Sequence, residues 1–179
     1  LLGSGDFHHL AAVLMDRAED DADRIHYVEL MTNAEHAEYC LGMPSEKHDS
    51  VALYTDNRKM HSEDRLDLWP RFLRDVLSQR GSDFASERYD YVIQHQVGAR
   101  FVKNMQKQGA LRFEQDMPPS LDALSEFANT ASTAHFLVLY EALRKRALPK
   151  GAKVLMVPAA SGIVTGALSA TVSSLSVEV

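Results

Sequence analysis

A chain of 179 residues, 45% hydrophobic and 25% charged, has the composition of an ordinary globular protein and the length of a single domain. Its formal net charge of -6 and its pI near 5.7 argue against a nucleic-acid partner, because phosphate binding normally requires a basic face. The longest apolar runs are too short to span a bilayer, and Cys40, the only cysteine, excludes an internal disulfide and a multi-cysteine metal site. We therefore expect a cytoplasmic protein without a membrane segment.

The first third of the chain predicts strands rather than helices. Residues 10–15 form an apolar run of strand length, and residues 24–31 alternate apolar with polar side chains, which is typical of a half-buried strand. The polar residues 16–23 would join these two strands as a hairpin loop. Residues 32–50 show no period and predict a long surface loop, which a short strand at 51–54 follows.

The middle of the chain predicts two helices around one buried strand. Apolar residues recur every three or four positions over 62–79, which indicates an amphipathic helix that Pro70 kinks or divides. A strand is expected at 91–94 and a second helix at 99–108, with Gly109 as its stop.

The last third predicts one more helix and two more strands. Residues 111–127 show no period; Pro118-Pro119 should force an extended path, and Ser120 could cap a short helical turn. The remaining expected elements are a helix at 132–148, a turn at 149–151, a strand at 154–157, a small-residue loop at 158–162 and a final strand at 163–175. This order of elements predicts an α/β layer with a mixed sheet.

Two polar residues, His95 and Asn129, are the candidate centre of a site. Each follows an ordered element and precedes a helix, a position from which a side chain can face a cleft at the edge of a sheet. Neutral imidazole and carboxamide could both donate to a thioester oxygen and stabilise the negative charge that develops on it. The alternative for a single histidine beside an apolar run is a buried packing residue.

Three segments resemble one family of enzymes. Residues 90–96 with Arg100 resemble the strand and His-Gln-Ala-Asn-x-Arg motif of the ketoacyl-ACP synthase III family, and residues 129–132 resemble its Gly-Asn-Thr-Ser segment. The stretch from 150 to 167 is similar to the ending of that family, a turn followed by an apolar strand and a glycine-rich loop. The resemblance implies a thiolase-like α/β fold with a mixed five-stranded sheet covered by helices.

The resemblance covers only the second half of the usual polypeptide of this family. Residues 1–179 would then be a C-terminal thiolase-like domain, and the N-terminal half, which carries the nucleophilic cysteine, would be absent from this chain. The first six residues, Leu-Leu-Gly-Ser-Gly-Asp, fit a larger polypeptide entered partway, although a processed terminus is the alternative. Cys40 lacks the small-residue context of a reactive thiol and is interpreted as a bystander. This polypeptide alone should be inactive.

The activity that the resemblance implies is an acyl transfer with condensation. A cysteine of the first half would take an acyl group from acyl-CoA, and His95 with Asn129 would stabilise the enolate that forms when a malonyl thioester loses carbon dioxide. The substrates would be CoA and phosphopantetheine thioesters, with no further cofactor and no metal. The expected partners are an acyl carrier protein, the N-terminal half and a second copy in a dimer.

Contacts with the substrate or carrier are expected at five further positions, namely Gln96, Gly98, Arg100, Ser161 and Gly162. Arg100 matches the family arginine that meets the acidic carrier, and Lys103 and Lys107 follow it on the same face of the predicted helix. The other histidines, His135 among them, show no metal-ligand spacing and are interpreted as surface or packing residues.

The sequence also departs from the family pattern near the expected site. Gly98 replaces an asparagine, Ala128 replaces the glycine before Asn129, and the loop at 158–162 is more crowded than usual. These changes favour an unusual acyl group, or acyl transfer to oxygen or nitrogen without condensation. A third alternative is a non-catalytic thiolase-like subunit that pairs with an active partner.

Overall fold

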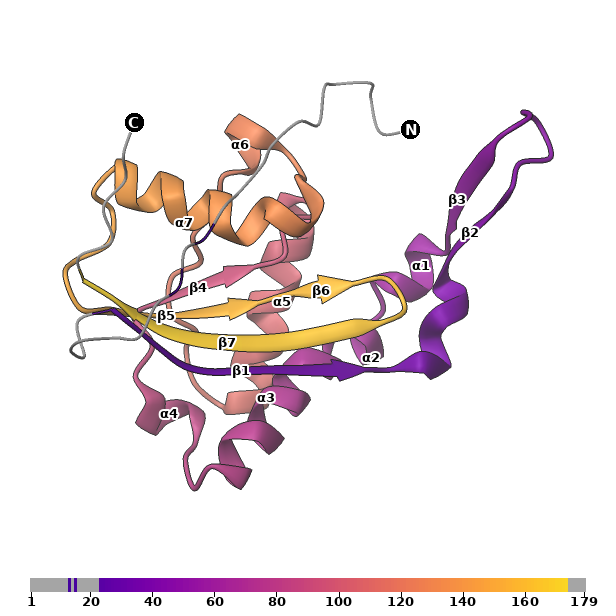
Figure 1. Ribbon diagram of the computed structural model, residues 1–179. Coiled ribbons are helices and arrows are strands. Elements are labelled where there is room, and N and C mark those ends of the chain that lie inside the picture. The colour runs from indigo at the N-terminus through magenta and orange to yellow at the C-terminus, as the bar shows by residue number, and fades with distance from the viewer. Residues whose placement is uncertain (1–12, 14, 16–22, 174–179) are drawn as a thin grey trace.

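The computed structural model describes Val13, Met15 and residues 23–173 (Figure 1). The strand predicted at 10–15 and the loop predicted at 16–23 fall mostly outside the described residues, and so does the end of the strand predicted at 163–175.

Strands and helices both recur along the described chain, in short runs of each kind. The strands are β1 (Arg24–Thr32), β2 (Cys40–Pro44), β3 (Val51–Thr55), β4 (Tyr91–Gln94), β5 (Ala152–Val157), β6 (Ala159–Ala160) and β7 (Val164–Val172). The α-helices are α1 (Asn57–Met60), α2 (Glu63–Leu66), α3 (Leu68–Gln79), α4 (Phe84–Glu87), α5 (Ala99–Phe113), α6 (Leu124–Phe127) and α7 (Ala134–Arg144). Two short 3₁₀ helices are η1 (Ala34–Tyr39) and η2 (Ala131–Thr133).

Five strands form one mixed sheet in the order β1-β7-β5-β4, and the short β6 pairs with the beginning of β7. β4 and β5 run parallel, whereas β7 is antiparallel to both β5 and β1. The expected α/β architecture with a mixed five-stranded sheet is therefore confirmed. The parallel strands are apolar along most of their length because helices cover them on both faces (Figure 1).

Side chains of the two parallel strands alternate between two hydrophobic clusters. Val92 and Leu155 belong to the cluster that contains Trp69 of α3, whereas Ile93 and Met156 belong to the cluster that contains Val138 of α7. Figure 1 shows α7 on one side of the sheet and α3 with α5 on the other. The strands thus present one row of side chains to α3 and the opposite row to α7.

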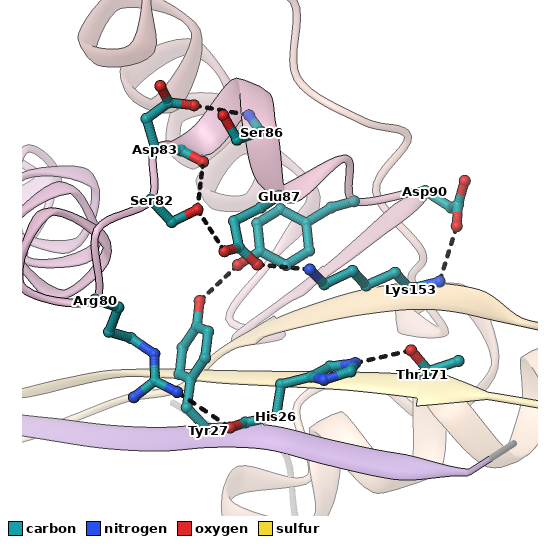
Figure 2. A network of polar contacts seen from close by, with 11 residues as sticks. His26, Tyr27, Arg80, Ser82, Asp83, Ser86, Glu87, Asp90, Lys153 and Thr171 are labelled. Atoms are coloured by element: carbon teal, nitrogen blue, oxygen red, sulfur yellow. Dashed lines mark hydrogen bonds and ion pairs between the residues drawn. The ribbon is translucent and has the colours of Figure 1, made fainter. Parts of the chain in front are cut away.

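A network of polar contacts joins α4 and the segment before β4 to strands β1 and β5 of the sheet (Figure 2). The hydroxyls of Tyr27 and Tyr89 share a buried hydrogen bond of 2.5 Å, and the Lys153 ammonium donates to the Glu87 carboxylate at 2.6 Å. Although burial favours the neutral carboxyl, hydrogen bonds from Lys153 and Ser82 lower the pKa of Glu87. The network begins just before β4, at the end of that strand opposite to His95.

The prediction of a long surface loop at 32–50 is wrong, because this segment contains η1 and β2. β2 pairs with β3 in an antiparallel hairpin, with Cys40 opposite Thr55 and Pro44 opposite Val51. No residue of either strand is buried, so the hairpin depends on backbone pairing rather than on an apolar face. The short strand predicted at 51–54 is confirmed.

The helix predicted at 99–108 continues as α5 to Phe113, so Gly109 is not its stop. A Cβ atom at Gly109 would lie 2.7 Å from both the Trp69 ring and the Met117 sulfur, and the glycine therefore permits close packing of α5 on α3. The break in the predicted 62–79 helix falls at Asp67, and Pro70 lies in the first turn of α3, where its missing N–H is tolerated.

The segment before α7 is more ordered than the sequence predicts. Residues 118–121 are extended, as the two prolines suggest, and they pair with the open edge of β4: Val92 N donates to Pro119 O at 3.0 Å and Leu121 N donates to Val92 O at 2.9 Å. Ser120 caps no helix. Its hydroxyl donates to Gln94 Oε1 at 3.3 Å, and α6 begins after Ala123.

α7 is shorter than the helix predicted at 132–148. It ends at Arg144, and Arg146 adopts a left-handed conformation with φ 52°. Ala147 N donates to Ala142 O at 2.8 Å, which closes the helix end. The turn predicted at 149–151 is present, with Gly151 at φ 82°.

Candidate functional site

β4 positions His95 at the edge of the sheet. His95 N donates to Val157 O at 3.2 Å, so the parallel pairing of β4 with β5 continues one residue beyond β4. The two glutamines beside His95 are fully buried, with Gln94 0% and Gln96 1% exposed. Gln96 Nε2 donates to Gln94 O at 2.7 Å, and Gln96 Oε1 accepts from Ala123 N at 3.3 Å. Hydrogen bonds therefore fix the backbone of His95 and of the residues on both sides of it.

The His95 ring is half-buried and neutral. Its centroid lies 5.8 Å from that of His135, with an angle of 19° between the planes. Burial lowers the pKa of His95 to about 4, with a smaller electrostatic contribution from His135. Nδ1 is buried without a hydrogen-bond partner among the described residues. A neutral imidazole with an unused ring nitrogen can take part in hydrogen bonding with a ligand.

Asn129 follows a strained turn. Ala128 has φ 55° and ψ -148°, a combination that glycine adopts far more readily than alanine. Asn129 Oδ1 accepts from Ala131 N at 3.0 Å, which fixes the side chain through its oxygen. No hydrogen bond within the described part of the chain uses Asn129 Nδ2, so both of its N–H groups stay free to donate.

The fold brings the segment of Asn129 toward the end of β4. Asn129 lies just before η2 and α7, and His135, the second residue of α7, stacks on His95. The side chains of His95 and Asn129 share no direct hydrogen bond in the described structure. Asn129 and His95 therefore both lie near the N-terminal end of α7, and their joint part in a site stays a prediction.

The expected binding residues differ in their surroundings. Gln96 is buried, and its amide group forms hydrogen bonds with the backbone of Gln94 and Ala123. Gly98 precedes α5 with an extended backbone, and a Cβ atom there would meet nothing within 4 Å. Arg100 is exposed in the first turn of α5, and Lys103 and Lys107 are also exposed.

Ser161 and Gly162 form the turn between β6 and β7. Ser161 is exposed, and Gly162 has φ 119°, where a side chain would be strained. Ile163 exchanges two backbone hydrogen bonds with Asn33, of 2.7 and 3.2 Å, which fasten this turn to the end of β1. The predicted loop 158–162 contains the short strand β6. Because β4 and β5 are parallel, His95 after β4 and this loop after β5 both lie beyond the carboxyl ends of these strands, at the same end of the sheet.

His135, which the sequence predicts as a surface or packing residue, is a buried residue of α7 that stacks on His95. A single histidine in a helix has neither a period nor a ligand spacing, and only the tertiary structure brings it to His95. Cys40 lies in the β2–β3 hairpin with its Sγ 3.5 Å from Thr55 Oγ1.

Other chemistry is sparse in the part of the chain that the structure describes. No group of three or more His, Cys, Asp or Glu residues there could hold a metal ion. None of the helices in residues 23–173 is long and apolar enough to cross a membrane. A polar cavity of about 360 Å³ lies between α2, α3 and α5, lined in part by Asp67, Arg74 and Arg112, and it includes none of the expected site residues.

Comparison with known proteins identifies both a family and a fold. The family model described as 3-oxoacyl-[acyl-carrier-protein (ACP)] synthase III C terminal matches residues 80–172. No curated protein matches the chain. The sequence-based expectation for the C-terminal part of the chain therefore agrees with an independent family description.

Solved structures share the fold at low sequence identity. FabH, the 3-oxoacyl-(acyl carrier protein) synthase III of Pseudomonas aeruginosa PAO1, is 15% identical with a TM-score of 0.69, over 90% of this chain and 48% of that one. OleA of Xanthomonas campestris, solved with lauric acid and lauroyl-CoA, is 18% identical with a TM-score of 0.66, over 84% and 41%. A tetronic acid condensing enzyme is 19% identical with a TM-score of 0.64, over 83% and 47%. The chain thus has the expected thiolase-like fold and spans just under half the length of these structures.

Proposed function

The chain belongs to the family of 3-oxoacyl-[acyl-carrier-protein] synthase III C-terminal domains, and from this membership we propose that it supplies His95 and Asn129 to the active site of a condensing enzyme. The observation that carries this proposal is a half-buried, neutral imidazole at the end of a parallel strand, whose Nδ1 has no hydrogen-bond partner among the described residues. The unused N–H groups of Asn129, at the same end of the fold, support it.

The proposed step is a decarboxylative Claisen condensation. The malonyl carboxylate leaves as carbon dioxide, and the electron pair of the broken carbon–carbon bond passes into an enolate of the thioester. An N–H of neutral His95 and the Nδ2 group of Asn129 donate to the enolate oxygen as its charge develops. The enolate carbon then attacks an acyl thioester on the cysteine of the N-terminal half, and that thiolate leaves.

The nucleophile and part of the pocket must come from outside this chain. We therefore propose an N-terminal ketosynthase half as the obligate partner, with acyl-CoA as donor and CoA or phosphopantetheine thioesters as the only carriers of the reacting groups. Cytoplasmic location and assembly as a dimer stay predictions of the sequence.

The exposed basic face of α5 is the proposed dock for an acyl carrier protein. Arg100, Lys103 and Lys107 recur within about one quarter of the helix circumference, so all three can meet an acidic partner at once. Arg100→Ala should raise the KM for a carrier-bound substrate and leave that for a CoA-bound substrate little changed. Arg71→Ala, an exposed arginine on α3, is the matched control. Equal effects on both substrates would exclude this dock.

Gly98 favours a second candidate function. Its Cβ position is open where the resemblance predicts an asparagine, so this chain offers one polar contact fewer near the expected thioester. Acyl transfer to an oxygen or nitrogen acceptor would need space at that position and would form a carbon–oxygen or carbon–nitrogen bond as the cysteine thiolate leaves, with no carbon–carbon bond formed. Product analysis after incubation with an acyl-CoA and either a malonyl thioester or a small alcohol or amine separates the two reactions.

The decisive experiment measures decarboxylation of a malonyl thioester by the intact protein with its N-terminal half. His95→Ala and Asn129→Ala should each lower the rate by roughly a hundredfold to a thousandfold, the usual effect of removing one oxyanion donor. His48→Ala, an exposed histidine in the turn of the β2–β3 hairpin, should leave the rate unchanged. Wild-type rates in both site variants would overturn the proposal, and a wholly inactive wild-type assembly would favour the non-catalytic subunit.

A further inference from the structure

His135 stacks on His95 and is bonded to the same carbonyl oxygen as His95. Its side chain is only 7% exposed, and His135 Nε2 lies 3.1 Å from Val157 O. The same carbonyl accepts the backbone N–H of His95 at 3.2 Å. One oxygen at the end of β5 therefore ties the backbone of one histidine and the ring of the other.

This bond fixes the tautomer of His135. A carbonyl oxygen can only accept, so His135 Nε2 must carry the proton, and in the neutral ring Nδ1 is then the acceptor. Burial lowers the pKa of His135, so the neutral form is the one present near pH 7. The ring that covers His95 is consequently uncharged and held in one orientation.

Packing alone does not explain a histidine at this place. Its neighbours on the inner face of α7 are Ala134 and Val138, both buried and apolar, and burying a polar ring is unfavourable unless its hydrogen bonds are satisfied. Phenylalanine could stack on His95 but could not donate to Val157 O. Glutamine could donate but would leave the face of the His95 ring uncovered. Histidine combines the two contacts.

We propose that His135 is a positioning residue of the site, which covers one face of the His95 ring and, through the Val157 carbonyl, fixes the direction in which His95 presents its N–H. This inference rests on the proposed function of His95. Its consequence is a split role for the two rings: His95 contacts the thioester oxygen, and His135 contacts only His95 and the sheet. Loss of either contact should let the His95 ring rotate away from its productive direction.

The test compares three variants of the intact protein. His135→Phe keeps the stack and removes the bond, His135→Gln keeps a donor and removes the ring, and Val138→Ala destabilises the same helix without touching His95. Both His135 variants should lower kcat for decarboxylation by about tenfold to a hundredfold with KM little changed, as expected when a catalytic group is misplaced by a fraction of a bond length. Val138→Ala should lower stability and leave kcat unchanged.

A spectroscopic readout separates this inference from the proposed function. In NMR spectra of the intact protein, the His95 ring should show narrow signals of one orientation in the wild type and shifted or broadened ring signals in both His135 variants. Wild-type kcat together with an unchanged His95 spectrum would make His135 a packing residue and overturn the inference. If His95→Ala retains full activity while the His135 variants still alter the His95 spectrum, the proposed function fails and the positioning of the ring stands.

Discussion

Relief of the strained turn before Asn129 gives a stability prediction that depends on one backbone conformation. Ala128 has φ 55° and ψ -148°, close to a region that only glycine populates freely, and its side chain is exposed. Such a conformation stores about 1–3 kcal/mol in a residue with a Cβ atom. Ala128→Gly removes this strain and loses no packing. Glycine also makes the unfolded chain more flexible, which offsets about 0.4–1 kcal/mol.

The expected net result of Ala128→Gly is a gain of about 1 kcal/mol or slightly more in the free energy of unfolding, measured by urea titration of the intact protein. Ala147→Gly is the matched control, because Ala147 is also exposed and does not have a positive φ. The control should lose stability by about 0.4–1 kcal/mol. If Ala128→Gly were destabilising to the same extent as the control, the turn would carry no strain and the reasoning would be refuted.

Three further predictions concern the core and the histidine site. Tyr27→Phe should destabilise the protein by about 1–3 kcal/mol in urea unfolding, because it removes the 2.5 Å bond to Tyr89 in a buried network, and adding Tyr89→Phe should cost less than the two single changes summed. Gly109→Ala should lower the melting temperature, since its Cβ atom would lie 2.7 Å from the Trp69 ring and overpacking of about 1–3 kcal/mol exceeds the helix-propensity gain of about 1 kcal/mol. Because the pKa of His95 falls from 6.5 to about 4 on folding, the unfolded chain binds more protons, so urea unfolding should show stability declining as the pH drops through this range.

Each of these three predictions has a contrary outcome. Additive effects of the two tyrosine changes would show that their hydroxyls are not coupled. A Gly109→Ala protein as stable as the wild type would mean that α5 and α3 can separate without loss of packing. For the pH series, the control is a His95→Phe variant, which should lose part of the acid-dependent slope; an unchanged slope would assign the effect to other groups.

The strands of the central sheet could be predicted because burial leaves a direct pattern in the sequence. β4 and β5 are short apolar runs since helices cover both of their faces. β1 is a strand as predicted but is not half-buried: Tyr27 is its one buried residue, and Ile25, Val28 and Leu30 are exposed. The β2–β3 hairpin left no comparable pattern, since none of its residues is buried. The prediction that Gly109 ends its helix was wrong for another reason. Glycine often follows the end of a helix, but here it lies inside α5, where the Trp69 ring leaves no room for a side chain.

The candidate site could be predicted only in part, because a sequence shows where strands and helices end but not which side chains meet in the fold. His95 and Asn129 stand where an element ends, and such places are visible in a sequence. Gln96 stands beside them in the same motif, yet the structure buries its amide against the backbone of Gln94 and Ala123. Its role in this chain is therefore to hold the end of β4. His135 could not be assigned from the sequence because its partner is forty residues away on another element.

The neutrality of His95 follows from the alternation of β4 and from the pitch of α7. Ile93 and His95 are two residues apart on the strand and so face the same side, where Ile93 packs in the cluster of Val138 and His95 stacks on His135. His135 and Val138 are in turn three residues apart on the helix and share one face. The histidine pair therefore continues the row of the apolar core to the edge of the sheet. An imidazole at the end of such a row loses much of its hydration, which lowers its pKa and keeps it uncharged.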